Sequence, residues 1–263
     1  MKWEFTDLEF QSLCERFNEG RMPRPFHFTS RIVLESDYDR EIAETQARLL
    51  AELGPSFGTA FEVIARPEVW VGAQAWVDND FRNPAHRLRL HGARRGRRAF
   101  VIRQEPGETL HHSGNITLFE CEPEEMPALL VAQLPPREAG WQPAVSIVKG
   151  GAPAPDPYES SMGGAFDSFE DSLETRSLAF LSTPAERTGA MRVVSGRSKY
   201  GPRGLTVSTL LWRDLPDDGR YLIDLDPETP IAVGVDAHKF AAALAGSIDR
   251  ILQQMEWRGE DEI

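Results

Sequence analysis

The sequence predicts an α+β fold: a central, mainly antiparallel sheet built from two pseudo-twofold-related halves and flanked by helical bundles. Apolar residues recur first at helical spacing and then, from Pro67, at every second position. Strand-like runs are joined by short turns instead of crossover helices, as in antiparallel sheets. The order helix, strand, hairpin, strand, helix also occurs twice, which indicates an internal duplication.

The first half opens on a helix with a capping box. In this motif the Thr6 hydroxyl accepts a bond from one free amide while Glu9 reaches back to another, and Gly20 ends the helix. Asp37 is the predicted cap of a second helix that ends at Leu53. The other elements expected in this half are a strand over 26–34, a helix over 56–65, strands over 69–76, from 88, over 99–102 and over 116–119, a turn over 92–96, and a helix opened by Pro123 that turns Leu129, Leu130 and Leu134 inward.

The second half follows a proline- and glycine-rich stretch. We expect an α+β half over 1–134, a connector over 135–164 and a second α+β half over 165–263, together one compact domain. An offset of 117 residues relates Pro67 and Gly72 to Pro184 and Gly189. The later elements are a helix over 166–181 with Phe166, Phe169, Leu173, Leu178 and Phe180 along one face, strands over 205–212, 221–223 and 231–235, and a final helix capped by Asp236.

Composition excludes several classes of protein. The 263 residues carry 29 Lys and Arg against 41 Asp and Glu, and the net charge of −12 argues against a general binder of nucleic-acid backbones. Cys14 and Cys121 are too few and too far apart for a disulfide scaffold or an all-cysteine zinc site. The acidic first residues do not resemble a signal peptide, and we expect a cytoplasmic protein.

Motifs for chemistry are scarce, and we assign no catalytic, metal-binding or cofactor-binding residue. No glycine-rich phosphate loop occurs, and the 196–204 stretch is interpreted as a basic hairpin loop. Adjacent His111 and His112 point apart in a strand or turn, so solvated histidines are expected there instead of metal ligands. A Ser-His-Asp triad stays open, because triads converge only in space. Phe81 and Tyr200, each beside Arg or Lys on comparable connections, suit an amphipathic patch for a partner.

The order of several short motifs resembles the EspG family, cytosolic chaperones of actinobacterial type VII (ESX) secretion systems. The resemblance covers nearly the whole chain. It rests on the opening helix from Phe5 to Phe10, on Pro23-Arg24-Pro25-Phe26, on Leu134-Pro135-Pro136, on Asp218-Gly219-Arg220-Tyr221-Leu222, and on an Ile-x-Val strand before the closing helix.

The resemblance implies a protein that binds the apolar tip of helical PE–PPE heterodimers and keeps them soluble, without catalysis, cofactor or metal. We expect the partner-binding residues in two loops and parts of the last helix. We assign Gly219, Arg220 and Tyr221 to folding, with Gly219 serving a tight turn and Tyr221 the packing of the sheet. The loop residues are Phe81, Arg82, Arg197, Lys199, Tyr200 and Arg203. An enzyme with an unrecognised pocket and a nucleic-acid-associated module are the competing interpretations, and homodimerisation stays open.

Overall fold

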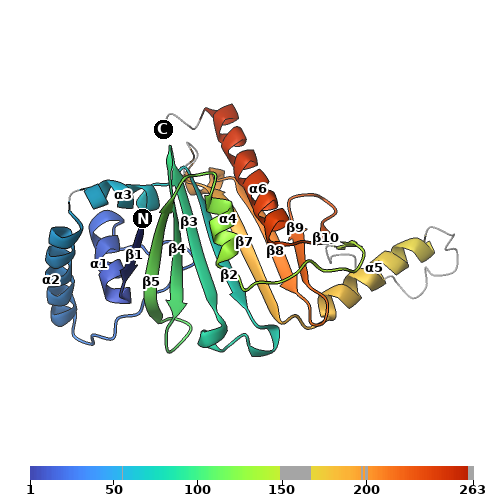
Figure 1. Cartoon of the computed structure of the whole chain (residues 1–263), viewed down its shortest axis with the longest axis horizontal. Helices are drawn as coiled ribbons and strands as arrows, with labels where there is room; N and C mark the ends of the chain where they lie inside the picture. Colours follow the sequence, from blue (N-terminus) through green and yellow to red (C-terminus); the bar gives the residue numbers. More distant parts are fainter. Residues whose placement is uncertain (55, 149–166, 197, 199–200, 260–263) are drawn as a thin grey trace.

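The computed structural model describes residues 1–54, 56–148, 167–196, 198 and 201–259. Within this part of the chain, ten strands form one sheet in the order β1-β5-β4-β3-β2-β7-β8-β9-β10-β6 (Figure 1). Every neighbouring pair of strands is antiparallel. The α+β fold with a mainly antiparallel central sheet is therefore confirmed.

The bounds of the elements follow the chain. The strands are β1 (Lys2–Phe5), β2 (Val69–Trp76), β3 (Leu88–Arg95), β4 (Arg98–Pro106), β5 (Ser113–Cys121), β6 (Val145–Ser146), β7 (Arg187–Ser195), β8 (Val207–Asp214), β9 (Arg220–Asp224) and β10 (Ile231–Gly234). The helices are α1 (Asp7–Phe17), α2 (Glu35–Leu53), α3 (Ser56–Ala65), α4 (Met126–Ala132), α5 (Asp167–Ser182) and α6 (Ala237–Arg258), with short 3-10 turns η1 (Asp78–Asp80), η2 (Pro84–His86) and η3 (Gly201–Gly204).

The pairing of β2 with β7 joins the two halves at the centre of the sheet. Ala73 lies opposite Met191, and Gln74 lies opposite Ala190. The sequence offset of 117 residues carries Ala73 onto Ala190 and Gln74 onto Met191. Exchanging the two halves turns the pair of Ala73 and Met191 into the pair of Ala190 and Gln74, and the reverse. The pseudo-twofold axis therefore passes between these two pairs. Each half contains an edge strand, then one or more helices, a four-stranded meander and a covering helix.

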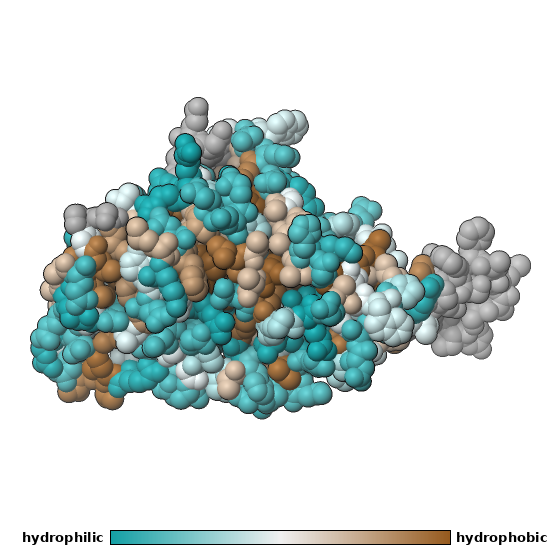
Figure 2. All heavy atoms as spheres, viewed as in Figure 1, coloured by the Kyte–Doolittle hydropathy of each residue, from teal (hydrophilic) through white to brown (hydrophobic). Residues whose placement is uncertain are grey.

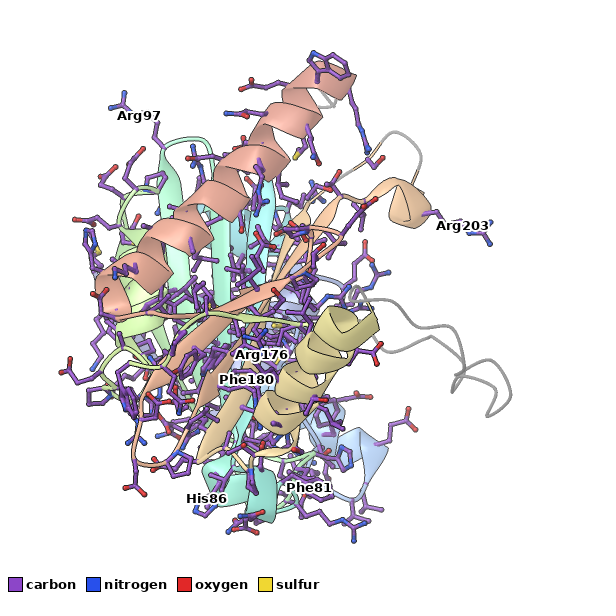
Figure 3. The ribbon with its side chains drawn as sticks, turned by 90° about the vertical axis from the view of Figure 1, so that its right-hand side faces the viewer. Phe81, His86, Arg97, Arg176, Phe180 and Arg203 are labelled. Atoms are coloured by element: carbon purple, nitrogen blue, oxygen red, sulfur yellow. The ribbon has the colours of Figure 1, made fainter. Side chains whose placement is uncertain are left out.

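The helices divide between the two faces of the sheet. α4 and α6 cover one face, here called the front face, and pack on the buried side of β2 formed by Val69, Val71, Ala73 and Ala75. α1 and α3 pack on the back face of β3 to β5, and α5 packs near β6, β8 and β9 at the other end of that face (Figures 1 and 3). The front view shows hydrophobic residues gathered along the middle of the molecule between more hydrophilic rims (Figure 2).

Short-range signals predicted many of these elements correctly. Thr6 accepts a hydrogen bond from the Glu9 amide at 3.2 Å, and the Glu9 carboxylate accepts one from the Thr6 amide at 2.8 Å, which completes the capping box. Asp236 caps α6 by accepting from the Lys239 amide at 2.7 Å. Alternation in β2 gives one fully buried face, as expected for a strand covered on one side.

The expected strand over 26–34 is wrong. This segment has no regular structure, and near its start it binds side chains of the sheet instead of a strand edge. The carbonyl of Arg24 lies 2.8 Å from Nδ1 of buried His91, and the side-chain amide of Gln104 donates to the carbonyl of His27 at 2.7 Å. The sequence pattern could not show these partners, because they come from strands that are distant in sequence.

Several boundaries also differ from the expectation. α2 begins at Glu35 with Leu34 at its cap, so Asp37 lies in the first turn and is not the cap. The predicted turn over 92–96 is shorter, because Gly92 lies within β3 under Leu130, and the chain turns at Gly96. Leu178 of α5 is exposed, although it was expected on the buried face. β1 and β6 were not predicted, and β6 lies inside the stretch expected as a connector.

Gly189 offers a test of the packing beside the central strand pair. A Cβ atom at this position would lie 2.2 Å from the ring of Trp212, which is fully buried. We expect Gly189→Ala to lower the free energy of unfolding by about 1–3 kcal/mol, because the ring has no free space to move into. Urea unfolding of the purified variant measures the change.

Gly246→Ala is the matched control. No atom lies within 4 Å of the added Cβ in the interior of α6, and alanine favours helix over glycine by about 1 kcal/mol. This variant should therefore be at least as stable as the parent. Equal stability of the Gly189 variant and the parent would contradict the packing described here.

Candidate partner-binding surface

The β2–β3 connection places Phe81 and Arg82 at one end of the sheet. Asn83 fixes the turn, since its Oδ1 accepts from the Ala85 amide at 3.0 Å and its Nδ2 donates to Asp80 at 2.8 Å. The ring of Phe81 is 51% exposed, and the guanidinium of Arg82 lies 5.5 Å from its centre. The predicted pair of an apolar ring beside a cation is therefore present on the surface.

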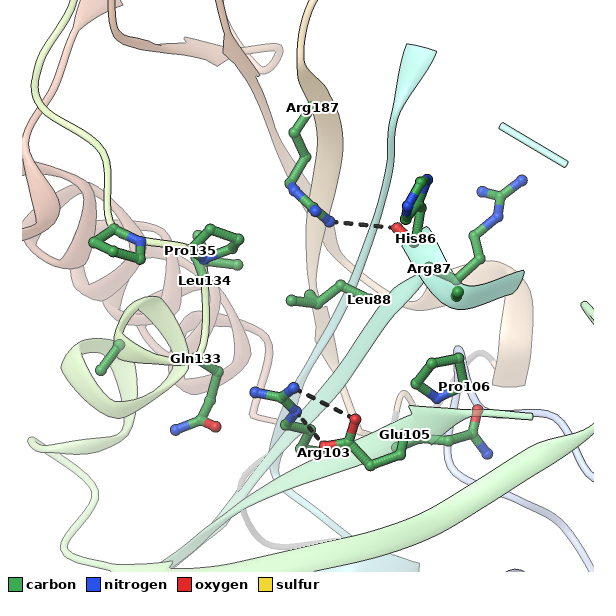
Figure 4. A pocket seen from close by; sticks show the side chains of 14 residues that line it. His86, Arg87, Leu88, Arg103, Glu105, Pro106, Gln133, Leu134, Pro135 and Arg187 are labelled. Atoms are coloured by element: carbon green, nitrogen blue, oxygen red, sulfur yellow. Dashed lines mark hydrogen bonds and ion pairs between the residues drawn. The ribbon is translucent and has the colours of Figure 1, made fainter. Parts of the chain in front are cut away.

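Two arginines hold this connection by its backbone. Arg87 donates to the carbonyl of Phe81 and lies over the ring of Trp76. Arg187, from the start of β7, donates to the carbonyl of His86 at 3.3 Å (Figure 4). Because both ends of the short connection are held, Phe81 projects from a fixed base.

Arg213 joins the connection to the end of α5. Its side chain is buried and donates to the carbonyls of Phe180 and Thr183. One of its nitrogens also lies 3.4 Å from Oδ2 of Asp78, which accepts from the Ala185 amide at 3.0 Å. The guanidinium thus satisfies carbonyls at the C-terminal end of a helix and a carboxylate of η1 together.

Two exposed apolar residues lie on the last turns of α5, the helix whose end Arg213 joins to this connection. Leu178 is 69% exposed and Leu181 is 44% exposed, and both flank Phe180, which turns inward. We call Phe81, Arg82, Leu178 and Leu181 the loop-and-helix surface. Of these residues, Phe81 is labelled at the lower end of the molecule in Figure 3.

The second predicted loop lies elsewhere. Arg197, Lys199 and Tyr200 lie outside the described residues. Arg203 is exposed in η3, at the opposite end of the sheet from Phe81 (Figure 3). β2 and β7 run antiparallel, with Trp76 opposite Thr188 and Val69 opposite Ser195, so their following connections point in opposite directions. At about 3.4 Å per residue the two ends are roughly 24 Å apart, and the two loops do not form one compact site.

Gly219, Arg220 and Tyr221 hold the chain that follows α4. Arg220 is buried and donates to both carboxylate oxygens of Asp214, at 2.7 and 2.8 Å, and to the carbonyl of Pro135 at 3.0 Å. The hydroxyl of Tyr221 donates to Asp218 at 2.7 Å and accepts from the Gln142 amide at 2.9 Å.

Close approach, not turn geometry, requires glycine at 219. The left-handed residue of this turn is Asp217, with φ of 55°. A Cβ on Gly219 would lie 2.6 Å from the backbone of Ala139. The expectation that Gly219 serves the tight turn is therefore corrected.

A cavity of about 390 Å³ opens on the front face near the C-terminal end of α4 (Figure 4). Arg103 and Glu105, which line it, form an ion pair at 2.7 Å. Its lining residues, all within the described part of the chain, include no serine, threonine, cysteine or lysine. The cavity therefore offers no hydroxyl, thiol or amine nucleophile.

The described residues contain no group of three histidine, cysteine or acidic side chains placed to hold a metal ion. Nδ1 of His112 lies 2.8 Å from the Thr109 hydroxyl, whereas the ring of His111 packs edge-on against His27. Burial raises the pKa of the Cys14 thiol, so this cysteine is a poor nucleophile. None of the described helices has the length and apolar character needed to cross a membrane.

The model of the EspG family matches residues 6–246. The chain belongs to the EspG family. In the described part of the chain this match spans every strand except β1, and every helix except the end of α6. A comparison with curated proteins finds no match.

A solved EspG structure has a similar fold. A structure of the Mycobacterium tuberculosis type VII secretion system chaperone EspG5, in complex with a PE25–PPE41 dimer, matches with a TM-score of 0.57 at 13% identity, over 96% of each chain. A Bacillus halodurans protein described as a candidate adenylate cyclase matches at 13% identity over 88% of this chain and 87% of that one. Its TM-score of 0.17 carries no argument about this EspG chain.

Several residues of the loop-and-helix surface and its support were missed by the sequence reasoning. Arg213 interrupts the apolar run of β8, and a charge in a buried strand indicates a specific partner. Asp78 precedes Phe81 by three residues and gave no separate signal. Leu178 was placed on the wrong side of α5 because the apolar pattern of this helix is weak.

Arg220 of this EspG chain allows a test of the buried ion pair. Arg220→Met leaves the carboxylate of Asp214 buried without its partner, and we expect a loss of about 3–5 kcal/mol in the free energy of unfolding. The double variant Arg220→Met with Asp214→Leu removes both charges and should recover much of that loss. Chemical denaturation of the parent, both single variants and the double variant gives the coupling energy. Additive losses would contradict a direct pair.

Proposed function

We propose that this EspG-family chain is a cytosolic, non-catalytic chaperone that binds the apolar tip of PE–PPE-type helical heterodimers. It would keep them soluble for the type VII secretion machinery. The observation that carries the proposal is the match over nearly the whole chain to a chaperone solved with a PE–PPE dimer, together with membership of the EspG family.

The physical need for such a chaperone is simple. An exposed apolar tip on a helical heterodimer would drive self-association, because burying that tip removes apolar surface from water. A second protein that covers the tip prevents this. Since the guest must later be handed on, the interface should combine a modest apolar centre with charges at its rim.

We place the guest on the loop-and-helix surface. It offers the exposed ring of Phe81 and the leucines of α5 as an apolar centre, with Arg82 beside them. Through their hydrogen bonds and ion pair, Arg213 and Asp78 hold the β2–β3 connection and the end of α5 in place. The surface therefore loses little conformational entropy when it binds a guest. The Arg203 loop stands about a full strand length away and serves as a comparison in the test below.

Phe81 and Arg82 provide the central test. We expect Phe81→Ala to weaken binding of a co-purified PE–PPE heterodimer by about tenfold or more, because the variant lacks the aromatic ring that the guest would bury. Arg82→Glu should weaken binding most at low ionic strength, where the reversed charge is least screened. Titration calorimetry at two salt concentrations measures both effects.

Arg203→Glu is the matched control for Arg82→Glu. It makes the same charge change on an exposed arginine at the opposite end of the sheet, and it should leave guest affinity unchanged. If Arg203→Glu weakens binding and Phe81→Ala does not, the guest binds elsewhere. If the tagged chain recovers no helical heterodimer from its native cell, the chaperone function itself is wrong.

A further inference from the structure

A small cavity on the back face gathers positive charge beside the β2–β3 connection. Its volume is about 210 Å³. Arg87 and Arg89 line it from the start of β3, His27 from the irregular segment, and His111 from the β4–β5 connection. The remaining lining residues are Gln74 and two leucines, so none of the lining residues, all of them described, is acidic.

The basic groups of this cavity have no carboxylate partner. Among the described residues, no ion pair joins Arg87, Arg89, His27 or His111 to an acid. This is unusual in a chain of net charge −12. Glu108, the acid nearest to His111 in the sequence, forms an ion pair with Arg31, with 2.7 Å between nitrogen and oxygen.

Arg89 is the buried member of the group. Its side chain is only 6% exposed, whereas His27 and His111 are exposed at the surface. Arg89 donates to Oε1 of Gln104 at 3.3 Å and to the carbonyl of Leu110, which uses two of its five N–H donors. Among the described residues the Arg89 guanidinium has no other acceptor, so its remaining N–H donors stay free beside the cavity.

Burial and neighbouring positive charges lower the pKa of two of these basic groups, Arg89 and His27. Desolvation, and next the charge of Arg87, lower the pKa of Arg89. Desolvation, and next Arg89 and His111, lower the pKa of His27. Cations that disfavour one another without a counter-charge are stabilised when an anion binds among them.

We propose that this cavity is an oxyanion-binding site that takes a carboxylate or phosphate group, with Arg89 at its base and Arg87, His27 and His111 around it. The volume accommodates a single such group with a short attached chain. The source is either a free small anion or an acidic side chain of the bound guest. The site itself does not rest on the proposed chaperone function, since it is complete in the free chain.

Sulfate titration of the free protein tests the site, because sulfate is an oxyanion that does not titrate between pH 5.5 and 8. We expect saturable binding, followed by the ring signals of His27 and His111 in NMR spectra and referenced to sodium chloride at equal ionic strength. Sulfate should raise the pKa of His27, and the affinity for sulfate should increase as the pH falls and His27 gains a proton.

Substitutions of the arginines that line the cavity test whether sulfate binds there. Arg89→Gln should lower sulfate affinity at least tenfold. If that variant fails to fold, Arg87→Gln, which changes a less buried member, should give a similar loss. Arg95→Gln, on the β3–β4 hairpin at the other end of β3, is the control and should bind sulfate as the parent does. An unchanged His27 pKa, or equal sulfate affinity in the parent and the Arg87 and Arg89 variants, would overturn the site.

The same titration on the guest complex identifies the source of the anion. Competition between sulfate and guest assigns the site to an acidic side chain of the guest. Unchanged sulfate affinity in the complex assigns it to a free anion. Either result supports the site, and failure of the free protein to bind sulfate overturns it whether or not a guest is captured.

Discussion

The antiparallel pairing of β2 with β7 determines the rest of this structure. It joins two four-stranded meanders into one sheet and removes two edges that would otherwise stay unpaired. Its register also decides which connections share an end of the sheet. The β2–β3 connection therefore meets the end of α5, and the β7–β8 connection cannot.

Two arginines hold the β2–β3 connection against the rest of the fold. Arg213 bridges the end of α5 and η1, and Arg187 holds the end of the same connection through His86. Such bonds fix the backbone before a partner arrives, so less of the binding free energy is spent on ordering the loop. The apolar residues that contact a guest can be few, because their positions are already set.

The sequence predicted what depends on neighbouring residues. The Thr6–Glu9 capping box, the Asp236 cap and the alternation of Val69 to Trp76 are local, and the fold class followed from their order. The pattern from Phe26 predicted a strand, because the bonds of His27 to the side chain of Gln104 join residues far apart in the chain and leave no local signal. Phe81 was found, but its union with α5 through Arg213 depends on tertiary contacts. The separation of Arg203 likewise needed the register of the central strands.

The pseudo-twofold axis has a further consequence for how such a protein diversifies. Rotation about it exchanges the β2–β3 connection with the β7–β8 connection, so duplication leaves two equivalent loops on opposite poles. Because the two connections lie at opposite ends of the central strands, a substitution at one of them is not constrained by the other. The loop at one end can therefore change in sequence to bind a partner, while the equivalent loop changes independently. The sheet between them stays the same.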